Sequence, residues 1–194
     1  MHNAVPEQLN LTPSNREKTS LMSLFNDDLS INWDAFIEVQ KEYFLSLDEE
    51  AFSKGRYDLT NRPEKHGTEG EFTIDHLQNV VASIEAIPGI PKNIKKPLVL
   101  ATLLHDIGKP FRNEDHGLDS VSVINDMFDD FEGSEMIKLA VRYHMVQSNA
   151  SAQELANILA TVEAYGIDKK QFVDLLLALK ACDIIDGKPG DAID

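Results

Sequence analysis

The chain has 194 residues, of which 42% are hydrophobic, so it is long enough to bury a core, and its length suits one globular unit. Its 18 lysines and arginines stand against 33 aspartates and glutamates, and the formal net charge of −15 disfavours binding to extended DNA or RNA. The single cysteine excludes an internal disulfide, and no stretch has the pattern of a secretory signal or the ~20 apolar residues of a membrane-spanning helix. We therefore expect a cytoplasmic protein with no membrane partner.

The N-terminal part of the chain divides into a tail and an extension. Residues 1–13 contain two prolines and no periodic pattern, which predicts a flexible tail. The residues from Ser14 to Glu17 have the spacing of a helix capping box, and Asn32 precedes a second amphipathic helix. Residues 14–56 are thus a predicted N-terminal helical extension. We expect its helices to pack on the main body, with contact to a second copy in a homo-oligomer as the alternative.

The segment from Tyr57 to Ile74 has no helical period and is rich in charged and turn-forming residues. This composition predicts a long loop, and long loops within compact domains are usually functional. Its His66, Glu69 and Glu71 are candidates for a pocket wall or for contacts that support the site.

Apolar residues recur at helical intervals through the rest of the chain, and residues 57–194 are the predicted main domain. They predict helices at about 75–87, 97–107, 118–129, 134–146, 151–165 and 168–186. Pro97 and Gly108 are expected to open and close the second of these helices, Ser151 starts a capping box, and Gly187 is expected to end the last. Since no segment alternates with period two, the predicted fold class is all-α.

Four of the six histidines fall into one ordered series with two aspartates. The series is His76, His105, Asp106, His116, His144 and Asp183. Neutral imidazole binds transition metals and aspartate supplies an anionic oxygen. His144 and Asp183 follow the apolar spacing of their helices, where an ionised carboxylate is costly to bury unless a partner such as a metal ion is present. Taken singly, each residue is more often a core residue than a ligand, but the complete series predicts a metal centre.

Short motifs surround these residues. They are LLHDIGKP around His105 and Asp106, RYHM around His144, and KACD ending at Asp183. Together with His76 they resemble the HD-domain superfamily of metal-dependent phosphohydrolases, over about residues 66–186. The EGE run at 69–71, the HDIGKP string and the HGLDS run that starts at His116 look most like the HD domain attached to bacterial CCA-adding tRNA nucleotidyltransferases and the HD domains of RNA-end repair enzymes. The resemblance implies an HD-domain helical bundle with one or two divalent ions.

The resemblance also implies roles for the series. His76, His105, Asp106 and Asp183 would hold a first ion, and Asp106 would bridge to a second ion held by His116 and His144. The interval of 11 residues between His105 and His116 is short beside many two-metal members, which makes His116 the weakest of the predicted ligands. The imidazole and carboxylate donors of the series suit Mn, Ni, Co, Fe or Zn, and Mg is a further candidate. The sequence does not distinguish among these metals.

The predicted catalytic residues are Asp106, which orients the attacking water and the ions, and Lys109, which neutralises charge on a phosphate. Lys109, Arg112 and Arg142 are the candidate substrate contacts. The chain lacks a G-x-x-x-x-G-K-[ST] phosphate loop and the distinguishing residues of cyclic di-GMP hydrolases, five-prime nucleotidases and dNTP triphosphohydrolases. The predicted reaction is therefore hydrolysis of a phosphomonoester or 2′,3′-cyclic phosphodiester of a small nucleotide-like anion or RNA end. A di-iron HD-domain oxygenase and a non-catalytic nucleotide-binding HD module are the alternatives.

Overall fold

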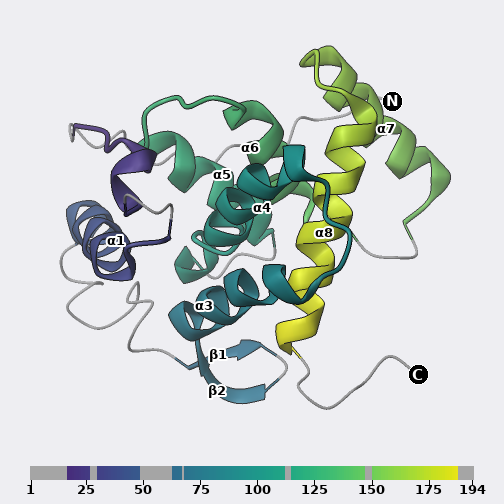
Figure 1. The fold of residues 1–194 in the computed structure, drawn as a ribbon. Helices are drawn as coiled ribbons and strands as arrows, with labels where there is room; N and C mark the ends of the chain where they lie inside the picture. Colours follow the sequence, from purple (N-terminus) through teal and green to yellow (C-terminus); the bar gives the residue numbers. More distant parts are fainter. Residues whose placement is uncertain are drawn as a thin grey trace.

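The apolar periodicity of the chain produces a helical bundle, which confirms the all-α class (Figure 1). The computed structural model describes residues 17–26, 30–48, 63–66, 68–111, 115–146 and 150–187. In chain order its elements are η1 (Leu21–Leu24), α1 (Trp33–Leu47), β1 (Pro63–His66), β2 (Thr68–Phe72), α3 (Thr73–Ser83), η2 (Ile84–Ala86), α4 (Lys92–Leu104), η3 (Lys109–Phe111), α5 (His116–Met127), α6 (Ser134–Tyr143), α7 (Ala152–Ala164) and α8 (Lys169–Gly187). None of the helices in these ranges has the length and apolar composition needed to cross a lipid bilayer.

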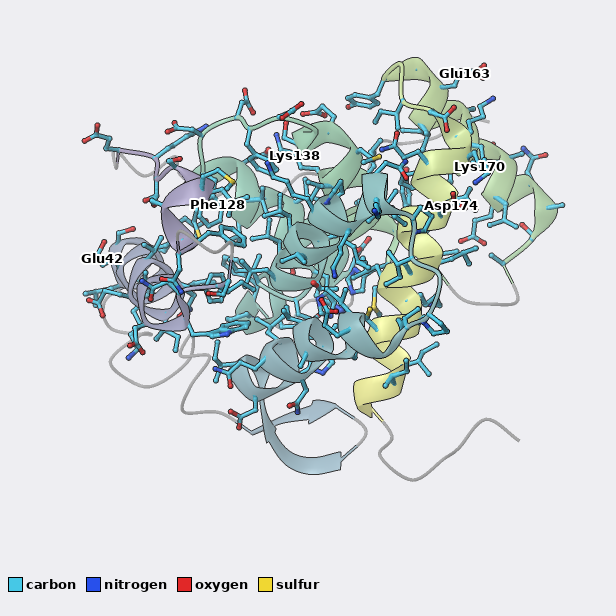
Figure 2. The ribbon with its side chains drawn as sticks, in the orientation of Figure 1. Glu42, Phe128, Lys138, Glu163, Lys170 and Asp174 are labelled. Carbon is cyan, nitrogen blue, oxygen red and sulfur yellow. The ribbon has the colours of Figure 1, made fainter. Side chains whose placement is uncertain are left out.

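Helix α4 lies at the centre of the bundle and packs against α3, α6 and α8, while α5 packs alongside α6 (Figure 1). Its second half is apolar on all sides, and Leu98, Leu103 and Leu104 are fully buried, as expected for a helix that other elements surround. Other charged side chains lie on the outside of the bundle, as in the ion pair between Lys170 and Asp174 on α8, whose Nζ and Oδ2 atoms are 2.6 Å apart (Figure 2). The carboxyl end of α4 consequently falls in the middle of the fold.

The helices of the N-terminal extension pack on the main body. The Phe44 ring of α1 contacts the Phe111 ring of η3 with 5.5 Å between centroids, and the Tyr43 hydroxyl donates to Asp126 Oδ2 at 3.2 Å. Asn32 caps α1 as predicted, since its side chain accepts the Ala35 N–H at 3.1 Å. The predicted tail at 1–13, and the first three residues of the predicted capping box, lie outside the described residues.

The first predicted helix is wrong in type and extent. Among residues 17–26, which the structure describes here, only Leu21–Leu24 is helical, as a 3₁₀ turn, and Phe25 is already extended and forms an isolated β-bridge with Ile31. Leu21 and Leu24 are both buried. A spacing of three residues is the repeat of a 3₁₀ helix, so a single short turn buries both side chains without an α-helix.

Part of the predicted loop at 57–74 is instead an antiparallel hairpin. Strands β1 and β2 pair with Pro63 opposite Phe72 and Glu64 opposite Glu71, and α3 begins directly afterwards at Thr73. The strands have four and five residues, with a register shift between Glu64 and His66, which is too short and irregular for period-two alternation to show. Residues 57–62, and the side chains of His66, Glu69 and Glu71, lie outside what the structure describes.

Helix α4 begins at Lys92, and the prediction that Pro97 opens it is wrong, because Pro97 lies inside the helix. Proline in the second turn removes one backbone hydrogen bond. The extra turn buries Ile94, which shares a face with Leu98 and Ala101, and this burial favours the longer helix. The helix also ends earlier than predicted, at Leu104, so His105 is its C-cap residue rather than part of its last turn.

Candidate metal centre

The structure brings all six predicted ligands together from five helices. His76 comes from α3, His105 and Asp106 from the end of α4, His116 from the first turn of α5, His144 from the end of α6, and Asp183 from α8. They form two groups, His76 with His105 and Asp183, and Asp106 with His116 and His144. Within each group one ligand atom per residue lies within 4.8 Å of the others. The predicted series is therefore a spatial cluster.

The first group, which we call the α8 group, is organised around Asp183. Its Oδ1 atom lies 3.1 Å from His76 Nε2 and 3.5 Å from His105 Nε2. Both histidines are buried, whereas the Asp183 side chain is 31% exposed. Two imidazole nitrogens and one carboxylate oxygen thus lie close together, and the carboxylate is the partly exposed member of the group.

The second group, which we call the α5–α6 group, joins the start of α5 to the end of α6. His116 Nε2 and His144 Nε2 are 3.2 Å apart, and Asp106 Oδ1 lies 3.3 Å and 3.5 Å from them respectively. His116 is 14% exposed and His144 is buried. The interval between His105 and His116, short in sequence, is long enough to bring His116 to the site.

Asp106 connects the two groups. Its Oδ1 atom faces the α5–α6 group, and its Oδ2 atom lies 3.3 Å from His76 Nε2 and 3.2 Å from His105 Nε2 of the α8 group. The side chain is only 1% exposed. One buried carboxylate therefore presents a separate oxygen to each set of imidazoles, which is the geometry of a bridging ligand.

The backbone fixes the orientation of two of the imidazoles. His105 Nδ1 lies 2.8 Å from the Thr102 carbonyl oxygen, and His144 Nδ1 lies 2.6 Å from the Val141 carbonyl oxygen. A carbonyl oxygen only accepts, so each Nδ1 carries the proton, and in the neutral ring Nε2 turns its lone pair toward the ligand groups. This tautomer is the one that binds a metal through Nε2, so the donor set fits a divalent ion.

Charges in the site shift its pKa values strongly. Burial alone would lower the pKa of His105, but the charge and hydrogen bond of Asp106, with a smaller effect of Asp183, raise it to about 10. Burial likewise opposes ionisation of Asp106, yet the neighbouring imidazoles, His105 first, hold the pKa of its carboxyl well below the usual range. Burial lowers the pKa of His144. Without a metal, a proton on His105 thus offsets part of the negative charge of Asp106 and Asp183. A bound cation would take over this role and displace the proton.

The HD-domain family model matches residues 73–187 of this chain, which is more than half of its length and includes all six predicted ligands. The chain belongs to the HD-domain family. No curated protein and no solved structure matches it. Membership indicates metal-dependent phosphohydrolase activity, and the finer resemblance to CCA-adding and RNA-end repair enzymes stays a prediction.

The turn that carries His105 and Asp106 in this HD domain is locked onto α5 by Ser120. The buried Ser120 hydroxyl donates to the His105 carbonyl oxygen at 2.7 Å and accepts the Gly108 N–H at 2.9 Å. A Cβ atom on Gly108 would lie 2.2 Å from Ser120 N, so only glycine allows this approach. The role of Ser120 was not predicted, although this residue lies one helical turn after His116 in the HGLDS run, which is the signal that could have indicated it.

Arg142, one of the candidate substrate contacts, forms an ion pair within the protein, and its role toward a substrate stays a prediction. Its Nη1 donates to both Asp115 carboxylate oxygens, at 2.7 Å and 2.8 Å, and Asp115 Oδ1 also accepts the Leu118 N–H at 3.1 Å as the N-cap of α5. The pair ties the start of α5 to the end of α6, beside His116 and His144. A second contact that the sequence did not indicate is the Lys180 ammonium, which donates to the His144 carbonyl oxygen at 3.1 Å.

Of the other two predicted substrate contacts, the structure describes Lys109 but not Arg112. Lys109, in η3, is buried, and its ammonium contacts Asp106 Oδ2 directly. It therefore lies at the carboxylate that both groups share, on the oxygen that faces His76 and His105. Arg112 lies outside the described residues, and its role stays a prediction.

Proposed function

We propose that this HD domain hydrolyses a phosphomonoester or a 2′,3′-cyclic phosphodiester of a nucleotide or RNA end, with one or two divalent ions. The observation that carries the proposal is the position of Asp106, which presents one oxygen to each of two histidine-containing groups. Such a pair of adjacent sites suits the clamping of a phosphate. The likeness of the EGE, HDIGKP and HGLDS runs to HD domains that act on RNA ends supports the terminal position of that phosphate.

In this proposal the protein residues hold the ions and orient the groups that bind them. When bound, two divalent ions supply a water-derived nucleophile at neutral pH and neutralise phosphate charge. Asp106 fixes the separation of the two groups, and the Thr102 and Val141 carbonyls keep His105 and His144 in the required tautomer. Lys109 holds a positive charge at the Asp106 carboxylate, where a phosphate oxygen would approach. Imidazole and carboxylate donors favour Mn, Fe, Co, Ni or Zn over Mg.

The test combines metal analysis with a substrate screen on the wild type and on Asp106→Asn, which keeps the side-chain volume and removes the charge. The screen covers nucleoside 2′,3′-cyclic phosphates, 2′-, 3′- and 5′-nucleotides and nucleoside triphosphates. We expect bound transition metal and turnover of a terminal phosphate in the wild type. The variant should lose metal and at least a hundredfold in kcat/KM, about 2.7 kcal/mol of transition-state stabilisation. Asp174→Asn, on the outer surface of α8, is the matched control and should behave as wild type.

Three results would contradict the proposal or part of it. Iron in the protein, an absorbance change on adding O₂ and no phosphoester turnover would favour the di-iron oxygenase. A protein that binds nucleotides without metal and hydrolyses none of the substrates would favour the non-catalytic module. Full metal content and activity in Asp106→Asn would rule out the bridging role of this carboxylate.

A further inference from the structure

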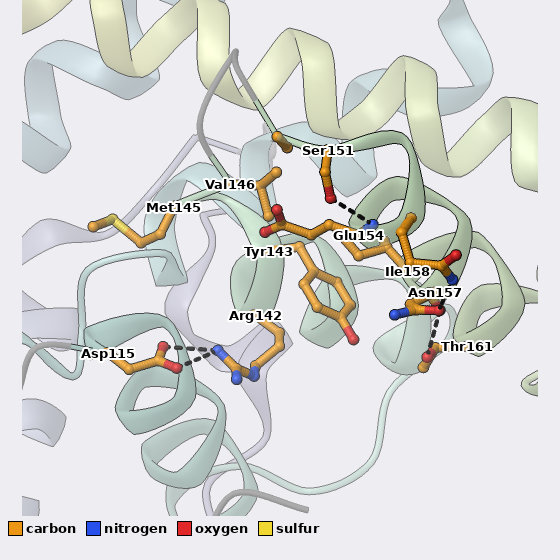
Figure 3. A pocket seen from close by; sticks show the side chains of 12 residues that line it. Asp115, Arg142, Tyr143, Met145, Val146, Ser151, Glu154, Asn157, Ile158 and Thr161 are labelled. Carbon is orange, nitrogen blue, oxygen red and sulfur yellow. Dashed lines mark hydrogen bonds and ion pairs between the residues drawn. The ribbon is translucent and has the colours of Figure 1, made fainter. Parts of the chain in front are cut away.

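A cavity of about 800 Å³ lies between the start of α5, the end of α6 and α7, and we call it the α6–α7 pocket (Figure 3). Residues from all three helices line it, among them Asp115, Arg142, Tyr143, Glu154 and Asn157. Its volume is in the range of small-molecule sites.

The pocket is next to the α5–α6 group of ligands. Asp115 directly precedes His116 in sequence, and Tyr143 directly precedes His144, so the wall of the pocket is one residue away from each of these ligands. Consecutive Cα atoms are about 3.8 Å apart. A molecule whose phosphate lies at the metal centre can therefore reach the pocket with the part that is bonded to the phosphate.

The charges of the pocket do not favour a second phosphate. Among the described residues that line it, Arg142 is the one cation, and both oxygens of Asp115 already accept from its Nη1. The exposed carboxylate of Glu154 adds a negative charge. The lining thus carries a formal charge of about −1 and would repel the additional phosphates of a di- or triphosphate.

The uncharged part of the lining suits a flat heterocycle. Tyr143 offers an aromatic ring near the apolar Ile158 and Val146 (Figure 3). Gln153 Nε2 donates to Asn157 Oδ1 at 2.9 Å, which orients the Asn157 amide while its own nitrogen keeps donor capacity. An aromatic ring, apolar side chains and an oriented amide together provide stacking and donor–acceptor recognition of a base.

We propose that the α6–α7 pocket binds the base of a nucleotide that has a single phosphate group at the metal centre, and that it discriminates against polyphosphates. For the reaction this inference rests on the proposed function, but binding of the base does not depend on hydrolysis. The experiment therefore has a binding arm and a kinetic arm, so that the failure of one proposal can be told from the failure of the other.

In the binding arm the four common nucleosides, which carry no phosphate, are titrated calorimetrically into the full chain and into Asn157→Ala. Asn157 is exposed on α7, so its truncation should leave folding intact. We expect at least one nucleoside to bind the wild type and to bind Asn157→Ala roughly tenfold more weakly. Tyr143→Leu, which removes the ring, should weaken binding of the same nucleoside. The proposal is overturned if no nucleoside binds the wild type, or if both variants bind as the wild type does.

In the kinetic arm KM and kcat are compared for nucleoside mono- and triphosphates and for phenyl phosphate, which lacks a base. Asn157→Ala should raise KM for the monophosphate with kcat unchanged and leave phenyl phosphate unaffected. Glu154→Gln removes a negative charge from the pocket and should lower KM for the triphosphate relative to KM for the monophosphate. Glu163→Gln, at the far end of α7, is the matched control and should change neither KM. Equal KM values for mono- and triphosphate in the wild type would overturn the proposal. If none of these phosphates is hydrolysed, the proposed function fails, and the binding arm alone decides whether the α6–α7 pocket binds a base.

Discussion

At the scale of single residues, Asp106 determines how the site is divided. A carboxylate has two oxygens, and the turn after α4 holds this one so that each oxygen meets different imidazoles. Complete burial would be costly for an ionised aspartate alone, and the surrounding imidazoles and Lys109 offset that cost. In turn the negative charge of Asp106 raises the pKa of His105 and keeps a proton on it, which links metal binding to pH.

Metal binding should release a proton from His105. The pKa of this imidazole is raised to about 10 in the metal-free site, so at pH 7 it is protonated, and an ion can bind its Nε2 only after that proton leaves. The pKa of His144 is lowered, so His144 is already neutral and should contribute almost no proton. We expect about one proton per ion bound at the α8 group, and an affinity that rises roughly tenfold per pH unit between pH 6 and 8.

Calorimetric titration of Mn²⁺ at pH 7 in two buffers of different ionisation enthalpy measures this release. For each ion bound, the apparent binding enthalpies in the two buffers should differ by about the difference between the two buffers' ionisation enthalpies, because one proton is released. Titration of the metal into each buffer alone is the control. Equal enthalpies in the two buffers, or an affinity independent of pH, would show that His105 is neutral in the metal-free protein.

The residues that carry the site could largely be predicted from the sequence, because histidine is rare and, apart from the adjacent pair His105 and Asp106, the predicted ligands lie on separate helices. The neighbours that position them could not. Ser120 is an ordinary polar residue until α5 is placed against the HD turn, and Arg142 resembles any exposed cation until Asp115 is opposite it. Both pairings join helices, so they depend on tertiary geometry that local spacing does not contain.

At the scale of elements, two glycines set how closely α5 approaches its neighbours. An added Cβ on Gly108 would meet the backbone of α5, and one on Gly117 would lie 2.8 Å from the Arg142 carbonyl oxygen of α6. Backbone atoms cannot rotate away as a flexible side chain can. These approaches hold His116, at the start of α5, against the turn of Asp106 and the end of α6.

Gly108→Ala should therefore displace α5 and weaken the α5–α6 group of ligands. The new Cβ would lie 2.2 Å from Ser120 N and 2.5 Å from the Asp119 carbonyl carbon. Overpacking of this kind typically costs about 1–3 kcal/mol. We expect a lower free energy of unfolding in urea and the loss of one bound ion where the wild type holds two. Gly89→Ala, which has open space and only the strain of φ +78°, is the control and should keep its metal.

The elements themselves were predictable where a cap or a long apolar face marked them. Asn32 and Ser151 cap α1 and α7 through side-chain hydrogen bonds, as their sequence positions indicate. The start of α4 was missed because a local rule about proline was outweighed by the burial of Ile94 in the core. The hairpin was missed because its strands pair with each other over too few residues to leave a pattern in the sequence.

At the scale of the whole molecule, the metal centre is where most of the bundle meets. Its six ligands come from α3, α4, α5, α6 and α8, which are far apart in sequence. The N-terminal extension supplies none of these ligands, yet Leu21, Phe36 and Phe44 belong to the same hydrophobic core as the rest of the chain. Because these apolar side chains are buried within the chain, unfolding of the bundle should expose the extension at the same time.

A bound ion should consequently stabilise the whole chain in one transition. An ion that binds only the folded state adds about 2.7 kcal/mol at a hundredfold excess over Kd, which raises Tm by roughly 5–10 °C for a chain of this length. Calorimetric melting of chelator-treated protein with and without Mn²⁺ measures the shift. Asp106→Asn should show little rise in Tm on adding Mn²⁺, whereas Asp174→Asn should show the same rise as the wild type. A separate early transition that is insensitive to metal would show that the extension unfolds independently, and an equal shift in Asp106→Asn would place the bound ion elsewhere.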